Sequence, residues 1–367
     1  MGTSTIVPER QAIIHGKDDK NRPIFAVLVK RTYDIRPGGR VTRAEKSRPL
    51  VPADQYYDDG DPEWATVKYE TDLAAFKLAT DVVILGKAFA PGGNAIFQLE
   101  VTVEVQEHRK TVRVSGDRHC RYRANAAPAF TDPIPFTEML IQYERAYGGK
   151  DSRSDPEAPF YYPRNYMGAG IVLKNAKEAV EGLPLPNIED PEDLLTPDRV
   201  VIGEPDRWHA QPLPDGLGWF QRTWYPRCSF VGAMPAYVDV DTHLREEQLG
   251  LVPKGQIALS KQFKLPSFDV RFNNGASRGL MFPRLGGQET FRLTHLTPSG
   301  SLTFQLPGEK PSIWLDLGKG ENQLEPLLNT VCVRLEEMQL DLVWSGAFVH
   351  PGLDWLPEMK KLVAHVA

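Results

Sequence analysis

The clearest pattern in the chain is an alternation of apolar and polar residues that begins near residue 80. Residues 80–89 are strongly apolar and end at the turn sequence Pro-Gly-Gly-Asn, after which residues 97–106 alternate strictly. A polar turn at residues 108–110 leads to a shorter alternating run. A period of two buries one face of a strand and exposes the other. Because the joining turns are short, we expect three neighbouring antiparallel strands.

A second series of alternating segments lies near the carboxyl end, and an earlier strand is expected at residues 24–35. The strands expected in the second series cover residues 291–295, 302–306, 313–317, 331–335 and 338–344. The predicted fold class is therefore mainly β, or β-rich α+β. Antiparallel meanders would form sandwich- or barrel-like lobes, accompanied by a few short helices and long ordered loops.

Helical periodicity is confined to short segments, at residues 136–146, 174–181, 242–248 and 356–366. Between residues 149 and 227 the chain is rich in Pro, Gly, Asp and aromatic residues. So long a connection is rarely structureless in a compact domain, so we expect ordered loops that carry much of the binding surface. We divide the chain into an N-terminal β lobe, a loop-rich span and a C-terminal β lobe with a terminal helix, at residues 1–150, 151–260 and 261–367.

Composition narrows the function classes. The 367 residues carry a net charge of −5 without a basic run, which argues against a nucleic-acid partner. No apolar stretch is long enough to span a bilayer, and the first residues lack an apolar export core, so we expect a cytoplasmic protein without a membrane partner. Cys120, Cys228 and Cys332 are far apart, which predicts reduced thiols rather than disulfides or a zinc site.

Candidate catalytic groups are few. Asp239, Asp241 and His243 form a D-x-D-x-H pattern that on a strand would place three metal ligands on one face, but an exposed strand that runs into a helix gives the same pattern. The acidic turn at residues 58–61 lacks the spacing of a calcium loop. We therefore expect no catalytic, metal or cofactor residues. The alternative is a hydrolase, with or without a metal ion, that acts on cell-envelope or carbohydrate material through Asp239, Asp241, His243 or Glu144.

One distinctive segment, Tyr-Glu-Arg-Ala-Tyr-Gly-Gly, covers residues 143–149. Other characteristic stretches are found at residues 25–35, 70–73, 77–83, 114–118, 185–191, 271–276 and 296–300. Together and in this order they resemble a bacterial family long known only as a domain of unknown function and associated with type VI secretion. The residues that carry these motifs, which we expect to be structural, are Tyr143, Glu144, Arg145, Gly148, Gly149, Asp117, Arg118, Asn187 and Asn273.

The resemblance implies a non-enzymatic adaptor and chaperone without a cofactor. Its partner would be a secreted toxin effector, bound near the N-terminal or spike-tip region of the toxin. The PAAR spike-tip protein or the spike itself is a further candidate partner. Exposed strand edges accept such partners, and aromatic residues supply anchors. The alternative for the aromatic residues is that they pin the loops to the core. The candidate partner-binding residues are Tyr161, Tyr162, Tyr166, Trp208, Trp219, Phe220 and Trp224.

Overall fold

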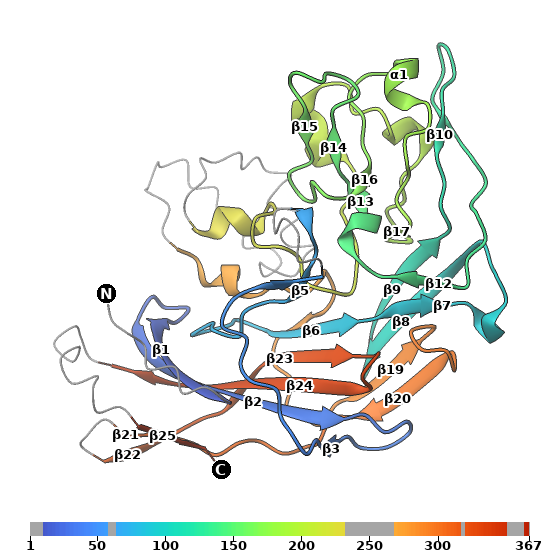
Figure 1. Ribbon diagram of the computed structural model, residues 1–367. Coiled ribbons are helices and arrows are strands. Elements are labelled where there is room, and N and C mark those ends of the chain that lie inside the picture. Colours follow the sequence, from blue (N-terminus) through green and yellow to red (C-terminus); the bar gives the residue numbers. More distant parts are fainter. Residues whose placement is uncertain (1–9, 58–63, 232–267, 317–319, 351–362, 367) are drawn as a thin grey trace.

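The computed structural model describes residues 10–57, 64–231, 268–316, 320–350 and 363–366. This part of the chain is mostly β and contains two large sheets (Figure 1). The larger sheet has the order β1 (Gln11–Lys17), β2 (Pro23–Asp34), β24 (Gln339–Val349), β23 (Leu327–Arg334), β6 (Thr80–Leu85) and β18 (Met281–Phe282), with β3 (Thr42–Arg43) paired to β2. The second has the order β17 (Ile188–Glu189), β9 (His108–Ser115), β8 (Gln98–Val105), β19 (Thr290–Thr294) and β20 (Ser301–Gln305). The predicted β-rich class is confirmed, and neither sheet closes into a barrel within the described ranges.

Strands from the two ends of the chain share both large sheets. In the larger sheet, β2 pairs antiparallel with β24 along its whole length, from Ile24 opposite Val349 to Asp34 opposite Gln339. In the second sheet, β8 pairs antiparallel with β19. Each large sheet therefore combines strands from the first 115 residues with strands from residues 281–349.

The first predicted meander is divided between sheets. The β8–β9 hairpin is confirmed, with Gln98 opposite Ser115. Residues 80–89 instead form β6 and a short strand, β7 (Lys87–Phe89). β6 joins the larger sheet, where it pairs parallel with β23 and antiparallel with β18. The expectation of three antiparallel neighbours is wrong for β6, because the chain crosses to the second sheet after β7.

Alternation along the strands builds the main core. Val101 and Val103 of β8 are fully buried and belong to the same hydrophobic cluster as Val331 and Leu340 of the larger sheet. Burial of one such side chain contributes about 1.5–3 kcal/mol. The apolar faces of the two sheets therefore meet as in a sandwich.

The opposite face of the larger sheet carries buried polar residues among apolar ones. Lys30 and Thr32 of β2 lie on this face, together with Asp341 of β24, which is opposite Thr32 in the register. The segment that contains β5 (Val67–Tyr69) lies above this face in Figure 1, and β5 pairs with β4 (Gln55–Tyr56). Below the sheet, β22 (Glu321–Leu324), β21 (Ile313–Asp316) and β25 (Val363–Val366) form a small sheet whose apolar residues pack against β2.

The remaining elements are short. The paired strands are β12 (Glu138–Leu140) with β7, β10 (Cys120–Arg121) with β11 (Ala129–Phe130), β13 (Tyr147–Gly148) with β16 (Ala169–Gly170), and β14 (Lys150–Asp151) with β15 (Phe160–Tyr161). The 3-10 turns are η2 (Pro91–Gly93), η3 (Tyr143–Arg145), η4 (Pro197–Arg199), η5 (Pro205–Ala210), η6 (Arg227–Val231) and η7 (Val270–Asn273). The loops between residues 120 and 202 surround a hydrophobic cluster of their own, so they are ordered as predicted.

The helix predictions have mixed outcomes. α1 (Lys177–Val180) confirms the helix expected near residues 174–181. Residues 136–146 form β12 and η3 rather than a helix, because β7 offers backbone partners to β12. The end of the predicted terminal helix is a strand, β25, paired with β21, and residues 242–248 are outside the described ranges. No helix in the described part of the chain has the length and apolar character needed to cross a bilayer.

Candidate functional site

A surface groove of about 420 Å³ lies beside β12. Its volume is within the range of roughly 300–1,000 Å³ typical of ligand pockets. Ile134 is 58% exposed at the groove, and the nearby Phe97 is 57% exposed. The lining residues are Lys87, Asp117, Ile134, Pro135, Phe136, Glu138, Met139, Leu140 and Arg145. The groove therefore combines apolar and charged side chains, and it is the candidate functional site.

One wall of the groove is an unpaired strand edge. Among the described residues, β12 pairs with β7 alone. The Ala90 N–H donates to the Thr137 carbonyl, and the Ile141 N–H donates to the Gly86 carbonyl. Because backbone groups alternate in direction along a strand, those of Glu138 and Leu140 point away from β7. Both residues line the groove, which therefore presents backbone hydrogen-bonding groups to a partner.

The charged residues of the groove form pairs of opposite sign. Lys87 and Glu138 form an ion pair of 2.9 Å, and Arg145 and Asp117 form one of 3.5 Å. Both pairs are largely exposed, so solvent screening leaves each with little effect on stability. Breaking these ion pairs to accommodate a bound segment would therefore cost little free energy.

Motif residues from three separate stretches meet at this wall. The Asn187 amide donates to Asp117 at 2.9 Å and to the Ser115 carbonyl at 3.0 Å, and it accepts from Arg145 at 3.1 Å. Arg118 forms an ion pair of 2.6 Å with the buried Glu189. The sequence offered these residues only as separate motifs, and the fold brings them together.

The segment at residues 143–149 fixes this wall to the core. The Tyr143 hydroxyl is 2.8 Å from the Ser277 hydroxyl, and burial raises its pKa. The Glu144 carboxylate accepts hydrogen bonds from the N–H and the hydroxyl of Thr66. Gly148 has a φ of +146°, and a side chain there would collide with the Asn165 carbonyl. Gly149, with a φ of +119°, similarly approaches the backbone of residue 168.

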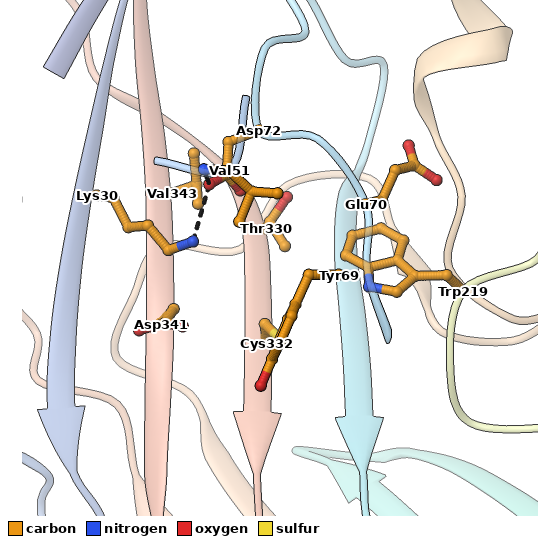
Figure 2. A pocket seen from close by; sticks show the side chains of 10 residues that line it. All are labelled: Lys30, Val51, Tyr69, Glu70, Asp72, Trp219, Thr330, Cys332, Asp341 and Val343. Atoms are coloured by element: carbon orange, nitrogen blue, oxygen red, sulfur yellow. Dashed lines mark hydrogen bonds and ion pairs between the residues drawn. The ribbon is translucent and has the colours of Figure 1, made fainter. Parts of the chain in front are cut away.

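A second polar cluster is buried above the larger sheet. Lys30 and Asp72 form an ion pair of 2.8 Å, and the Val51 N–H donates to the same carboxylate at 2.7 Å (Figure 2). The cavity beside this pair measures only about 10 Å³. A single water molecule occupies roughly 10–15 Å³ by the same measure. This interior cavity is therefore too small for a substrate.

Glu70 is held by two arginines in this cluster. It accepts from two nitrogens of Arg227 at 2.6 Å each and from Arg222 at 2.8 Å. Burial alone would raise the pKa of Glu70, but the charges of Arg227 and Arg222 outweigh it and lower the pKa from 4.5 to about 2. Arg227 also donates to the Phe220 and Phe272 carbonyls, so this pair ties together three distant segments.

The stretches at residues 77–83 and 271–276 meet in the same buried region. Asp81 accepts from Lys77 at 2.6 Å, from the Asn274 amide at 3.1 Å and from the Gly275 N–H at 3.2 Å. The Asn273 amide donates to the carbonyl of residue 76 at 2.8 Å. These motif residues therefore maintain the layer that covers the larger sheet.

The seven aromatic residues predicted to contact a partner divide into two groups. Tyr162, Trp219, Phe220 and Trp224 are buried in the protein's own core. Trp224 is fully buried and packs edge-on against Tyr143, with ring centroids 5.0 Å apart. In this structure these four residues pin the loops to the core, which is the alternative that the sequence left open.

The other three aromatic residues reach the surface. Tyr161 is 40% exposed and lies 5.9 Å from Trp64, a 41% exposed residue that sequence reasoning did not single out. Tyr166 also contacts Trp64, at 5.6 Å. Trp208 is half-buried and carries the Arg164 guanidinium 4.6 Å above its ring. A contribution of these three residues to partner binding stays a prediction.

The structure describes the thiols, but not the acidic patterns, that were candidates for catalytic or metal-binding groups. Cys120 and Cys332 are buried, unbridged thiols, and burial raises the pKa of each to about 12. The patterns at residues 58–61 and 239–243 are outside the described ranges. In the part of the chain that the structure does describe, no group of three or more His, Cys, Asp or Glu residues is arranged to hold a metal ion.

Comparison with known proteins yields one match. A family model for an uncharacterized protein conserved in bacteria, DUF2169, matches residues 20–345. Neither the curated proteins nor the solved structures contain a match. The matched region includes the groove and the buried polar cluster around Glu70 and Asp81. Because the match covers most of the chain, the protein belongs to the DUF2169 family of uncharacterised bacterial proteins.

Proposed function

We propose that the protein is an adaptor that binds a type VI secretion toxin effector in the groove beside β12, keeps it soluble and helps to load it onto the secretion spike. The observation that carries this proposal is the unpaired edge of β12 within a groove lined by both apolar and charged residues. The link to secretion comes from the resemblance of the sequence motifs. Binding of an extended segment needs no catalytic group, since main-chain hydrogen bonds supply affinity and side-chain pockets supply selectivity.

The partner segment is extended and carries apolar side chains at alternate positions. It would add a strand to β12 and hydrogen-bond to the backbone of Glu138 and Leu140, each bond contributing about 0.5–1.5 kcal/mol. Its apolar side chains would cover Ile134 and Phe136, which line the groove. Because the groove carries both positive and negative side chains, we expect it to favour neither an acidic nor a basic segment strongly.

The test is binding of the toxin encoded beside the gene, measured by pull-down and calorimetry with purified proteins. Leu140→Pro removes one N–H that faces the groove, and Leu140→Ala is its matched control because it truncates the side chain but keeps that N–H. We expect the proline variant to bind at least tenfold more weakly than the alanine variant. Equal affinities would contradict binding at the edge of β12.

A second pair of variants tests the apolar part of the groove. Ile134→Ser should weaken toxin binding, because Ile134 is exposed in the groove. Val349→Ser is the control, since Val349 is also an exposed apolar residue, 41% accessible, but it ends β24 in the larger sheet, which does not include β12. Urea unfolding of each variant verifies that the fold is retained. Absence of any complex with the wild-type protein would refute the proposed function itself.

A further inference from the structure

β1 is the outer strand at one end of the larger sheet, and within the described ranges it pairs with β2 alone. The pairing is regular: its seven residues are matched from Gln11 opposite Val29 to Lys17 opposite Pro23, without a bulge. β1 contains no proline, and Lys17 at its end is its one Lys, Arg, Asp or Glu residue. Charges, prolines and bulges protect strand edges from pairing with other chains. The middle of β1 has none of them, so its open edge is suited to a partner strand.

Two hydrogen bonds at the ends of β1 define which of its backbone groups face outward. The Lys30 N–H donates to the Arg10 carbonyl at 2.8 Å, and the Asp18 N–H donates to the Arg22 carbonyl at 3.0 Å. Because backbone direction alternates along an antiparallel strand, the even-numbered residues of β1 point their N–H and C=O groups toward β2. The odd-numbered residues point theirs away from the sheet. These outward-facing residues are Gln11, Ile13, His15 and Lys17.

The order of residues in β1 suits pairing of the strand with a copy of itself. We propose that β1 pairs antiparallel with β1 of a second copy of this chain, around a two-fold axis at Ile14, so that the two larger sheets become continuous. In this register Gln11 lies opposite Lys17 and Ile13 lies opposite His15. Each of these pairs joins two outward-facing residues, as the hydrogen-bonding pattern of an antiparallel pair requires. Ile14, whose backbone points toward β2, meets its equivalent as a non-hydrogen-bonded pair.

Side chains also match between the two copies in this register. On one face the partly buried Ile14 side chains meet at the axis, and the small residues Ala12 and Gly16 lie opposite each other on either side of it. The exposed Arg10 of each copy comes opposite Asp18 of the other, whose carboxylate also pairs with a residue of its own turn. Apolar and oppositely charged cross-strand pairs are favourable, and no like charges are opposed between residues 10 and 18. The two-fold axis repeats every match, which favours a second copy over an unrelated segment.

The proposed interface is distant from the groove. β1 and β12 lie on opposite sides of the molecule in Figure 1. A dimer through β1 therefore leaves the groove of each copy open and presents two grooves in one assembly. Dimerisation consequently does not depend on toxin binding, and either one can be absent without the other.

Analytical ultracentrifugation of the full-length protein over a range of concentrations measures the association. We expect the wild type to form a dimer. Ile13→Pro removes one outward-facing N–H, and it should raise the dissociation constant of the dimer at least tenfold relative to Ile13→Ala. The alanine variant is the matched control, because it truncates the same side chain but keeps that N–H. Urea unfolding verifies that both variants are folded. A wild type that stays monomeric at every concentration, or equal dissociation constants for the two variants, would overturn the proposal.

A disulfide between the copies tests the register. Cα atoms of a non-hydrogen-bonded pair are about 4.5 Å apart, within the range of roughly 4.4–6.8 Å that a disulfide spans. Ile14→Cys should therefore give a covalent dimer on mild oxidation. Lys17→Cys is the control, because the two copies of residue 17 would be about 20 Å apart along the paired strands. Both variants carry Cys228→Ser, since Cys228 is partly exposed.

The gel pattern under non-reducing conditions decides the outcome. A covalent dimer of Ile14→Cys without one of Lys17→Cys supports the register. Cross-linking of Lys17→Cys instead, or of neither variant, would overturn it. A protein that is monomeric alone and loses toxin binding in Ile13→Pro but not in Ile13→Ala would assign the edge of β1 to the toxin and likewise overturn the proposal.

Discussion

Replacement of Glu70 by glutamine tests the account of the buried polar cluster most directly. The substitution keeps the shape of the side chain but removes its charge. Arg227 and Glu70 are 1% and 2% exposed, so the arginine would be left buried with its main counter-ion gone. Removing one partner of a buried ion pair typically costs about 3–5 kcal/mol of unfolding free energy.

The pKa of Glu70 gives a separate measure of the same interaction. A decrease from 4.5 to about 2 corresponds to about 3 kcal/mol at 1.36 kcal/mol per pKa unit. Because the folded pKa is depressed, this contribution is complete above pH 4.5 and is lost as the pH falls toward 2. We therefore expect Glu70→Gln to destabilise the protein by about 3 kcal/mol at pH 7, and the difference from wild type to shrink below pH 4.5.

Urea unfolding at several pH values measures both effects. Glu138→Gln is the matched control, because Glu138 pairs with Lys87 at the surface and is 51% exposed. It should change the unfolding free energy by less than about 1 kcal/mol. If Glu70→Gln costs no more than this control at pH 7, or if its effect does not depend on pH, the reasoning about the buried pair is refuted.

Other predictions follow from burial and backbone geometry. Gly148→Ala should lower the unfolding free energy by at least about 2 kcal/mol in urea titrations, because a Cβ would meet the Asn165 carbonyl at a positive φ; an unchanged midpoint would contradict this. Trp224→Ala should cost about 3–5 kcal/mol in the same assay, whereas a role in partner binding alone would leave stability intact. Cys120 and Cys332 should resist an aromatic disulfide reagent at pH 8 in the folded protein and react in urea, and fast labelling of either of these two thiols, as distinct from the partly exposed Cys228, would contradict their burial.

Local patterns in the sequence predict where strands occur better than they predict which strands pair with one another. Strict alternation correctly identified β8, β9, β19 and β20, because half-buried strands display their two faces in the sequence. The continuous apolar run of β6 signals burial but not which neighbour it meets, and its parallel pairing with β23 spans about 250 residues. The helix expected at residues 136–146 failed because pairing of β12 with β7 overrides local periodicity.

For the candidate site too, the sequence identified some residues but not others. The motif residues Asp117, Arg145 and Asn187 were identified from the sequence, and the structure places them together at one wall of the groove. Ile134 and the open edge of β12 carried no signal, since an exposed apolar residue in a proline-containing loop is ordinary. The burial of Trp224 could not be predicted from the sequence either, because aromatic residues in loops are found both in protein cores and at interfaces.

The pairing of β2 with β24 has a consequence for how the protein is made. Their paired residues are separated by most of the chain, as in Ile24 opposite Val349. Chains dominated by such distant contacts fold slowly, because the intervening loop must close before the contacts form. During synthesis, the backbone edge of β2 that pairs with β24 has no partner until the ribosome has made almost the entire polypeptide. We therefore expect the nascent chain to depend on cellular chaperones, and truncation before residue 339 to yield an aggregating product rather than a stable half.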